Sequence, residues 1–93
     1  MERSSITTLA RALGGKLWCG DGNCGTYEFP NLYKALLFRY QVPFQTLVSH
    51  RNVVNVWFDT LLDNEMLAYH KNDLKNLKEY IKHPELYPGV DLT

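Results

Sequence analysis

Long apolar runs and an excess of charge of either sign are both missing from this chain of 93 residues. A membrane-spanning helix needs roughly 20 predominantly apolar residues in a row, and the sequence has neither such a run nor the apolar core of a signal peptide near Met1. Ten Lys and Arg balance ten Asp and Glu, which disfavours a polycation that neutralises nucleic-acid phosphates. We therefore expect a small soluble protein that stays in the cytoplasm and does not engage a membrane.

Cysteine is also scarce, since only Cys19 and Cys24 occur. Two cysteines are too few for a disulfide framework and fit a reducing compartment. A closed zinc site needs four ligands, and His50, His70 and His83 form no compact second pair. We predict no cofactor. A metal or thiol site centred on Cys19 and Cys24, or a disulfide between them across a hairpin, stays open as a weaker alternative.

Recognisable catalytic motifs are absent as well. The glycines within 20–25 lack the Lys-Ser/Thr and the helix N-terminus that make a phosphate-binding loop, and a tight turn explains them. Pairing Cys24 as a nucleophile with His50 or His70 needs hydrogen-bonding distance, which the sequence does not indicate. Nothing in the sequence favours an enzyme, and we find no repeat or low-complexity tract.

What the chain does contain is a globular composition, with 45% hydrophobic and 13% aromatic residues, and a length that fits one domain spanning 1–93. Hydrophobic spacing and turn residues predict the order α-β-β-α-β-β-β-α. The elements are a helix at about 5–13, strands at 16–19 and 26–29, a helix at 32–41, strands at 44–50 and 53–58, a turn over 59–65, a strand at 66–70, a helix from Asn72 or Asp73 to 82, and an irregular tail at 84–93.

This order predicts the α+β class, with an antiparallel sheet of about five strands, two hairpins plus one strand, packed with three helices. Gly14-Gly15 ends the first helix, and Pro43 forces the second to stop before it. The links between strands are too short for the crossovers of a parallel sheet. Residues 59–65 stay ambiguous between turn and helix, and we prefer a turn because Asp63-Asn64 is a turn dipeptide.

Two aromatic side chains have unexpected predicted positions. In the strand 53–58 the apolar side carries Val54, Val56 and Phe58, which leaves Trp57 on the mixed side. On a wheel of the second helix, Phe38 projects with the polar residues, away from the face formed by Leu32, Tyr33, Leu36, Leu37 and Tyr40. We expect Phe38 and Trp57 to be partly exposed, unless helices cover both faces of the sheet and bury them.

Exposed aromatic rings often anchor protein interfaces, so these two are candidate partner-binding residues. Further candidates are Asp21 and Asn23 at the hairpin tip and Asp59, Asp63 and Glu65 in the acidic turn. We predict a non-catalytic module that binds another protein by occupying its surface. In size and style, the chain resembles the small inhibitors that phages and mobile elements deploy against host enzymes or defence effectors; no particular residue carries that resemblance.

The alternative is nucleic-acid binding through a lysine ridge on the third helix. The ridge consists of Lys71, Lys75, Lys78 and Lys82, which could follow a phosphate backbone while Tyr69 and Tyr80 stack on bases. Asp73 and Glu79 interrupt the positive charge, and the solvated face of any amphipathic helix has the same pattern. The sequence leaves the identity of a partner and the oligomeric state open.

Overall fold

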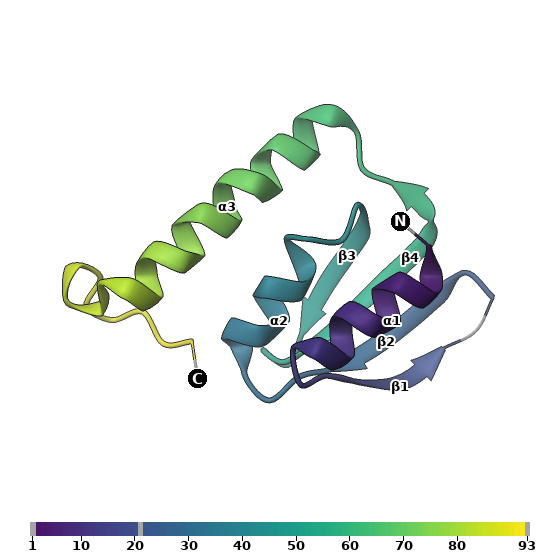
Figure 1. Cartoon of the computed structure of the whole chain (residues 1–93), viewed down its shortest axis with the longest axis horizontal. Helices are drawn as coiled ribbons and strands as arrows, with labels where there is room; N and C mark the ends of the chain where they lie inside the picture. Colours follow the sequence, from purple (N-terminus) through teal and green to yellow (C-terminus); the bar gives the residue numbers. More distant parts are fainter. Residues whose placement is uncertain (1, 21, 93) are drawn as a thin grey trace.

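Three helices and four strands make up the part of the chain that the structure describes, residues 2–20 and 22–92 of a computed structural model (Figure 1). The prediction for Asp21 therefore lies outside the described residues. The elements are α1 (Arg3–Ala12), β1 (Lys16–Gly20), β2 (Cys24–Glu28), α2 (Leu32–Arg39), β3 (Phe44–Ser49), β4 (Val53–Leu61), α3 (Asn64–Lys82) and the short 3₁₀ helix η1 (Pro84–Leu86).

The strands form one antiparallel sheet in the order β1-β2-β4-β3. Two hairpins, β1–β2 and β3–β4, are joined by pairing β2 with β4, so β4 lies inside the sheet and β1 and β3 lie at its edges. The expected α+β class, with antiparallel hairpins and three helices, is confirmed. The observed order is α-β-β-α-β-β-α.

The predicted fifth strand, 66–70, is wrong, because these residues form the first turns of α3. The helix begins at Asn64 after the N-cap Asp63, nine or ten residues before the predicted cap at Asn72 or Asp73. Asp63 does not make a turn of its own: its carboxylate accepts a hydrogen bond from the backbone N–H of Met66 at 2.8 Å, which is an N-cap. The predicted turn over 59–65 is also shorter than expected, since β4 continues to Leu61 and only 62–63 connect the two elements.

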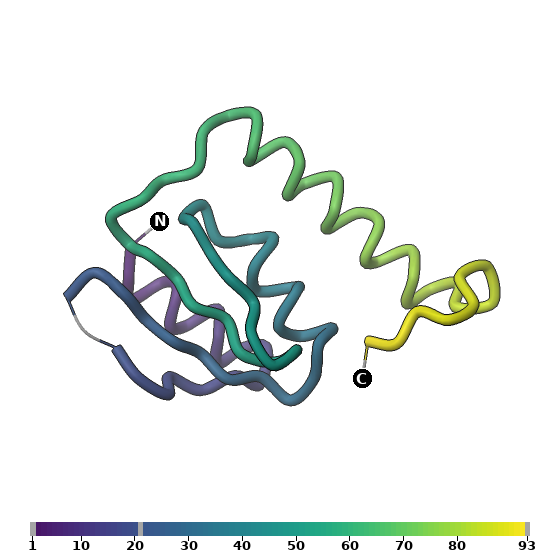
Figure 2. The backbone as a smooth tube through the Cα atoms, turned by 180° about the vertical axis from the view of Figure 1, so that it is seen from behind, coloured from purple at the N-terminus to yellow at the C-terminus, as the bar shows by residue number. Residues whose placement is uncertain are grey.

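Both α1 and α2 pack on the same face of the sheet, and α1 lies across it in Figure 1 and behind it in Figure 2. One buried cluster combines residues of both helices with the sheet: Ile6, Ala10, Ala35 and Phe38 with Tyr27, Val54 and Val56. Val54 and Val56 are fully buried, as the alternation in their strand predicted. The alternative in which helices cover both sheet faces is wrong for the described elements.

The prediction that Phe38 is partly exposed is wrong. Its ring is 0% exposed and lies 5.1 Å from the ring of Tyr27 and 4.9 Å from that of Phe29. Six of the eight residues of α2 are apolar, so a helical wheel gives no clear inner face. The helix is also covered from a second side, where the ring of Tyr40 meets His70 of α3 at 5.5 Å.

In contrast to α2, α3 lies beside the helical layer and outside the sheet (Figure 1). Of its 19 residues only His70 and Leu77 are buried. None of the described helices is both long and apolar enough to cross a membrane.

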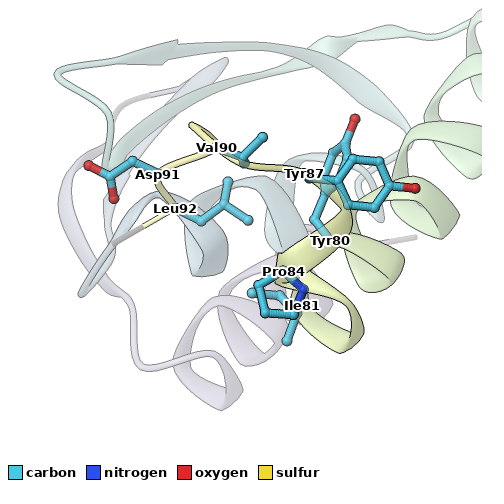
Figure 3. A pocket seen from close by; sticks show the side chains of 7 residues that line it. All are labelled: Tyr80, Ile81, Pro84, Tyr87, Val90, Asp91 and Leu92. Carbon is cyan, nitrogen blue, oxygen red and sulfur yellow. The ribbon is translucent and has the colours of Figure 1, made fainter.

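The irregular tail after α3 folds back onto the molecule (Figure 3). Tyr87 packs its ring edge-on against Tyr80, with 4.4 Å between the ring centres. Farther on, the carbonyl oxygen of Leu92 accepts a hydrogen bond from the backbone N–H of Tyr33 at 2.9 Å. Arg51, in the β3–β4 turn, donates to the carbonyl oxygen of Asp91 at 2.8 Å. The tail thus links the end of α3 to the start of α2 and to the β3–β4 turn.

Candidate functional site

The face of the sheet that α1 and α2 leave uncovered is the candidate site, and we call it the open face. Strand alternation decides its members, because successive side chains point to opposite sides. In β4, Val54 and Val56 point into the core, so Asn55 and Trp57 point out. The register then places Trp57 between Cys24 and Gln45, and Asn55 between Thr26 and Leu47.

Apolar side chains gather at the β3–β4 side of the open face. The side chain of Leu47 is 55% exposed and that of Trp57 is half-buried. With Gln45, Thr46 and Thr60 they line a shallow hollow of about 380 Å³. An exposed leucine beside an indole ring is the kind of contact that protein interfaces use as an anchor.

Polar groups lie beside this apolar cluster, toward β2 and β1. The hydroxyl of Thr26 donates to the side-chain oxygen of Asn55 at 2.8 Å, which orders the neighbouring row of the sheet. At the far end Lys16 is the register partner of Glu28, so one positive and one negative charge oppose each other across two strands. The open face therefore has an apolar cluster on its β3–β4 side, polar groups beside it, and one charge of each sign at the far end.

Of the predicted partner-binding residues, Trp57 lies on the open face and Asn23 lies at its edge. The carbonyl oxygen of Asn23 accepts a hydrogen bond from the backbone N–H of Phe58 at 2.8 Å, which brings the hairpin tip beside Trp57. Phe38 is excluded as an exposed anchor because it is buried on the opposite side of the sheet.

The acidic residues at the end of β4 and the start of α3 are exposed but contact local groups. Asp63 caps α3, Glu65 accepts a hydrogen bond from the hydroxyl of Tyr69 at 3.3 Å, and Asp59 accepts one from Thr60 at 3.2 Å. Asp63 and Glu65 thus stabilise the first turns of a helix, which is a sufficient structural reason for their positions.

Among the exposed apolar side chains of the sheet, Leu47 and Trp18 were not predicted as candidate binding residues. Leu47 shares one side of β3 with Gln45 and Ser49, opposite the buried Phe44 and Thr46, so the alternation of the strand was a signal for its exposure. Trp18 is 64% exposed and is the extra residue of a bulge in β1, between the register positions of Leu17 and Cys19. Nothing in the local sequence marks that bulge.

Cys19 and Cys24 lie on paired strands, and neither is in a disulfide. Cys19 pairs with Thr26, two residues along β2 from Cys24, so the two thiols are diagonal neighbours rather than directly opposite. Within residues 2–20 and 22–92 no three His, Cys, Asp or Glu side chains come together as metal ligands. The alternative of a metal site at Cys19 and Cys24 therefore finds no third ligand among the described residues.

The structure does not bring Cys24 to either of the histidines considered as its base. Cys24 begins β2, whereas His50 lies beyond the register position of Glu28. Four residues of strand separate the two positions by at least about 13 Å. His70 lies on α3, which packs on the helical side of the sheet. A catalytic pair of this kind is not assembled.

The lysine ridge exists as an exposed stripe. Its four lysines are all exposed, and none forms an ion pair with another described residue. Burial, and then the charge of the nearby Asp73, raise the pKa of the Tyr40 phenol. Tyr80 packs on Tyr87 and is not available as a free stacking platform, in contrast to the exposed Tyr69.

Comparison with protein-family models, with curated proteins and with solved structures finds no match to this chain.

Proposed function

We propose that this protein is a non-catalytic module that binds another protein through the open face. The observation that carries the proposal is the half-buried Trp57 beside the exposed Leu47, on a sheet face that no described helix covers. Large apolar groups on a rigid sheet lose little side-chain entropy on binding, and they release water when a partner covers them.

The chemistry of the open face indicates the kind of partner. An apolar projection on the partner would fill the hollow between Trp57 and Leu47, while Gln45, Thr26 and Asn55 offer hydrogen-bonding groups around it. Lys16 opposite Glu28 leaves little net charge, which is unsuited to a phosphate backbone. We therefore infer a protein partner with a protruding aliphatic or aromatic side chain.

Capture of the partner from the native source, followed by affinity measurement, tests this proposal. Truncation of a hot-spot aromatic costs about 2 kcal/mol or more of binding free energy, so Trp57→Ala should weaken binding by about 30-fold or more. Leu47→Ala should weaken it as well, because this residue forms the other wall of the hollow. Thermal melts of both variants must show that they stay folded.

The matched control is the triple variant Lys75→Gln, Lys78→Gln, Lys82→Gln, which changes an exposed surface of α3 and leaves the open face intact. It should bind the captured partner as tightly as the parent protein. If the control loses the partner while Trp57→Ala and Leu47→Ala retain it, the open face is not the binding surface.

The more specific prediction, an inhibitor from a phage or mobile element that blocks a host enzyme or defence effector, stays a prediction. It requires the captured partner to be such an enzyme or effector and its activity to fall as the complex forms. A partner whose activity is unchanged in the complex would contradict inhibition and leave the binding module in place.

Nucleic-acid binding remains the second candidate, favoured by the exposed and unpaired lysines of the ridge. If it is correct, labelled DNA or RNA should bind with an affinity that falls steeply with salt, and the triple lysine variant should lose both affinity and salt dependence. Trp57→Ala should have no effect on that binding. This pattern is the reverse of the one expected for the open face.

A further inference from the structure

A separate cavity of about 370 Å³ lies between α3 and the helices α1 and α2. Its lining is mostly apolar and comes from three parts of the chain: Leu9 of α1, Tyr40, Gln41 and Val42 at and after the end of α2, and Leu67, His70, Lys71 and Leu74 of α3. Its volume is in the lower part of the range found for small-molecule sites. The cavity lies on the helical side of the molecule, away from the open face.

His70 is the unusual residue of this cavity. It is only 6% exposed, and its Nδ1 is buried without a hydrogen-bond partner among the described residues. A buried polar atom normally finds a partner, since burial removes the water that would otherwise satisfy it. The ring is held in place by edge-on contact with Tyr40. Because Nδ1 is sealed from water, it does not face the cavity, and Nε2 is the nitrogen of this imidazole that can meet a ligand there.

The charged and titratable groups around the imidazole come from the end of α2 and from α3, the helix that carries His70. Arg39 is the last residue of α2 and Tyr40 follows it, Lys71 and Asp73 lie on α3, and the contribution of α1 to the cavity is the apolar Leu9. Burial, and then Arg39, lower the pKa of His70, while Asp73 acts in the opposite direction. The imidazole is thus neutral at neutral pH, and Lys71 is the cation of the lining, which contains no carboxylate.

We propose that this cavity binds a small aliphatic carboxylate, with its alkyl chain against Leu9, Leu67 and Leu74 and its carboxylate at Lys71 and His70. The apolar lining would bind the alkyl chain of the ligand, which loses contact with water on binding. Lys71 accounts for the negative charge, and the imidazole offers a hydrogen bond to the same head group. The proposal is independent of the proposed function, which concerns the opposite side of the sheet.

Octanoate is a suitable probe, followed through the imidazole proton signals of the three histidines. His50 and His83 are exposed and distant in sequence from the cavity lining, so they serve as internal references. We expect octanoate to shift the His70 signal in a saturable way and to raise its titration midpoint, because a nearby carboxylate favours the imidazolium. Absence of a saturable shift at concentrations below micelle formation, or equal shifts of all three histidines, would overturn the proposal.

Matched variants and a matched ligand test the role of charge. Lys71→Gln should weaken octanoate binding about two- to fivefold, as expected for a partly solvated ion pair. Lys75→Gln, one turn along the same exposed stripe but outside the lining, should leave it unchanged. Octanol should bind more weakly and should not raise the His70 midpoint. If octanol binds as tightly as octanoate and Lys71→Gln has no effect, the carboxylate assignment is wrong.

Leu47→Ala keeps the two proposals distinguishable. This substitution alters the open face and leaves the cavity lining intact, so octanoate binding should persist in a variant that has lost the protein partner. Loss of octanoate binding in Leu47→Ala would place the ligand on the open face and overturn the cavity assignment.

Discussion

Phe38 is one of the largest fully buried side chains. It is fully buried between the rings of Tyr27 and Phe29, where α2 meets the sheet. We predict that Phe38→Ala lowers the free energy of unfolding by about 3–5 kcal/mol, which in a domain of this size lowers Tm by more than about 10 °C. Trp18→Ala, at a position that is 64% exposed, should stay within about 0.5 kcal/mol of the parent. Equal melting temperatures for the two variants would contradict this assignment.

His70 predicts a pH dependence of stability. Because burial and Arg39 lower its pKa in the folded state, the unfolded chain takes up the proton more readily. Stability is then fully present above the ordinary histidine pKa of about 6.5 and falls as the pH decreases from there toward the lower folded pKa. Urea denaturation midpoints at pH 7.5 and 5.5 measure this loss, and in His70→Gln it should be smaller. His83→Gln, at an exposed position, should keep the full loss.

Among the elements, α3 combines regular local structure with weak attachment. Its capping aspartate, Asp63, identifies the start of the helix, yet only His70 and Leu77 are buried. Few buried contacts give a low free energy of local opening, so amide hydrogens of α3 should exchange faster than those of β4. Asp63→Ala should remove about 1 kcal/mol of helix stability and raise the exchange rate of α3 further. Exchange in α3 as slow as in β4 would contradict a weakly attached helix.

Local sequence signals predicted most helices and strands, but they failed where the same residues are typical of both a turn and the start of a helix. Gly14, in the left-handed region at φ +80°, ends the first helix as expected, and Asn31 caps α2 by accepting from the N–H of Lys34 at 2.9 Å. Aspartate followed by asparagine suits a turn and a helix start alike. The choice between turn and helix at Asp63-Asn64 depended on whether the following residues could pack as a helix. His70 and Leu77, seven residues apart, lie on the same side of a helix and are both buried there.

For the molecule as a whole, we expect the C-terminal tail to contribute little to the free energy of unfolding. Residues 84–91 are exposed, and the tail is held by the Tyr80–Tyr87 contact and by hydrogen bonds from Tyr33 and Arg51. A chain ending at His83 should therefore melt within several degrees of the parent protein, while amide signals at the end of α3 and the start of α2 change. Collapse of the whole fold on this truncation would show that the tail is part of the core.

The hydrophobic pattern alone was enough to establish the α+β class, the two hairpins and the orientation of β4, because a period of two leaves only one way to bury Val54 and Val56. It also placed Trp57 on the opposite side. The tertiary structure decided what periodicity leaves open: which side of the apolar helix α2 meets the sheet, and that both helices share one face. Packing between distant segments made Phe38 a core residue, placed Leu47 of β3 next to Trp57 of β4, and enclosed His70 beside a cavity. These outcomes depend on long-range contacts, and no local pattern encodes them.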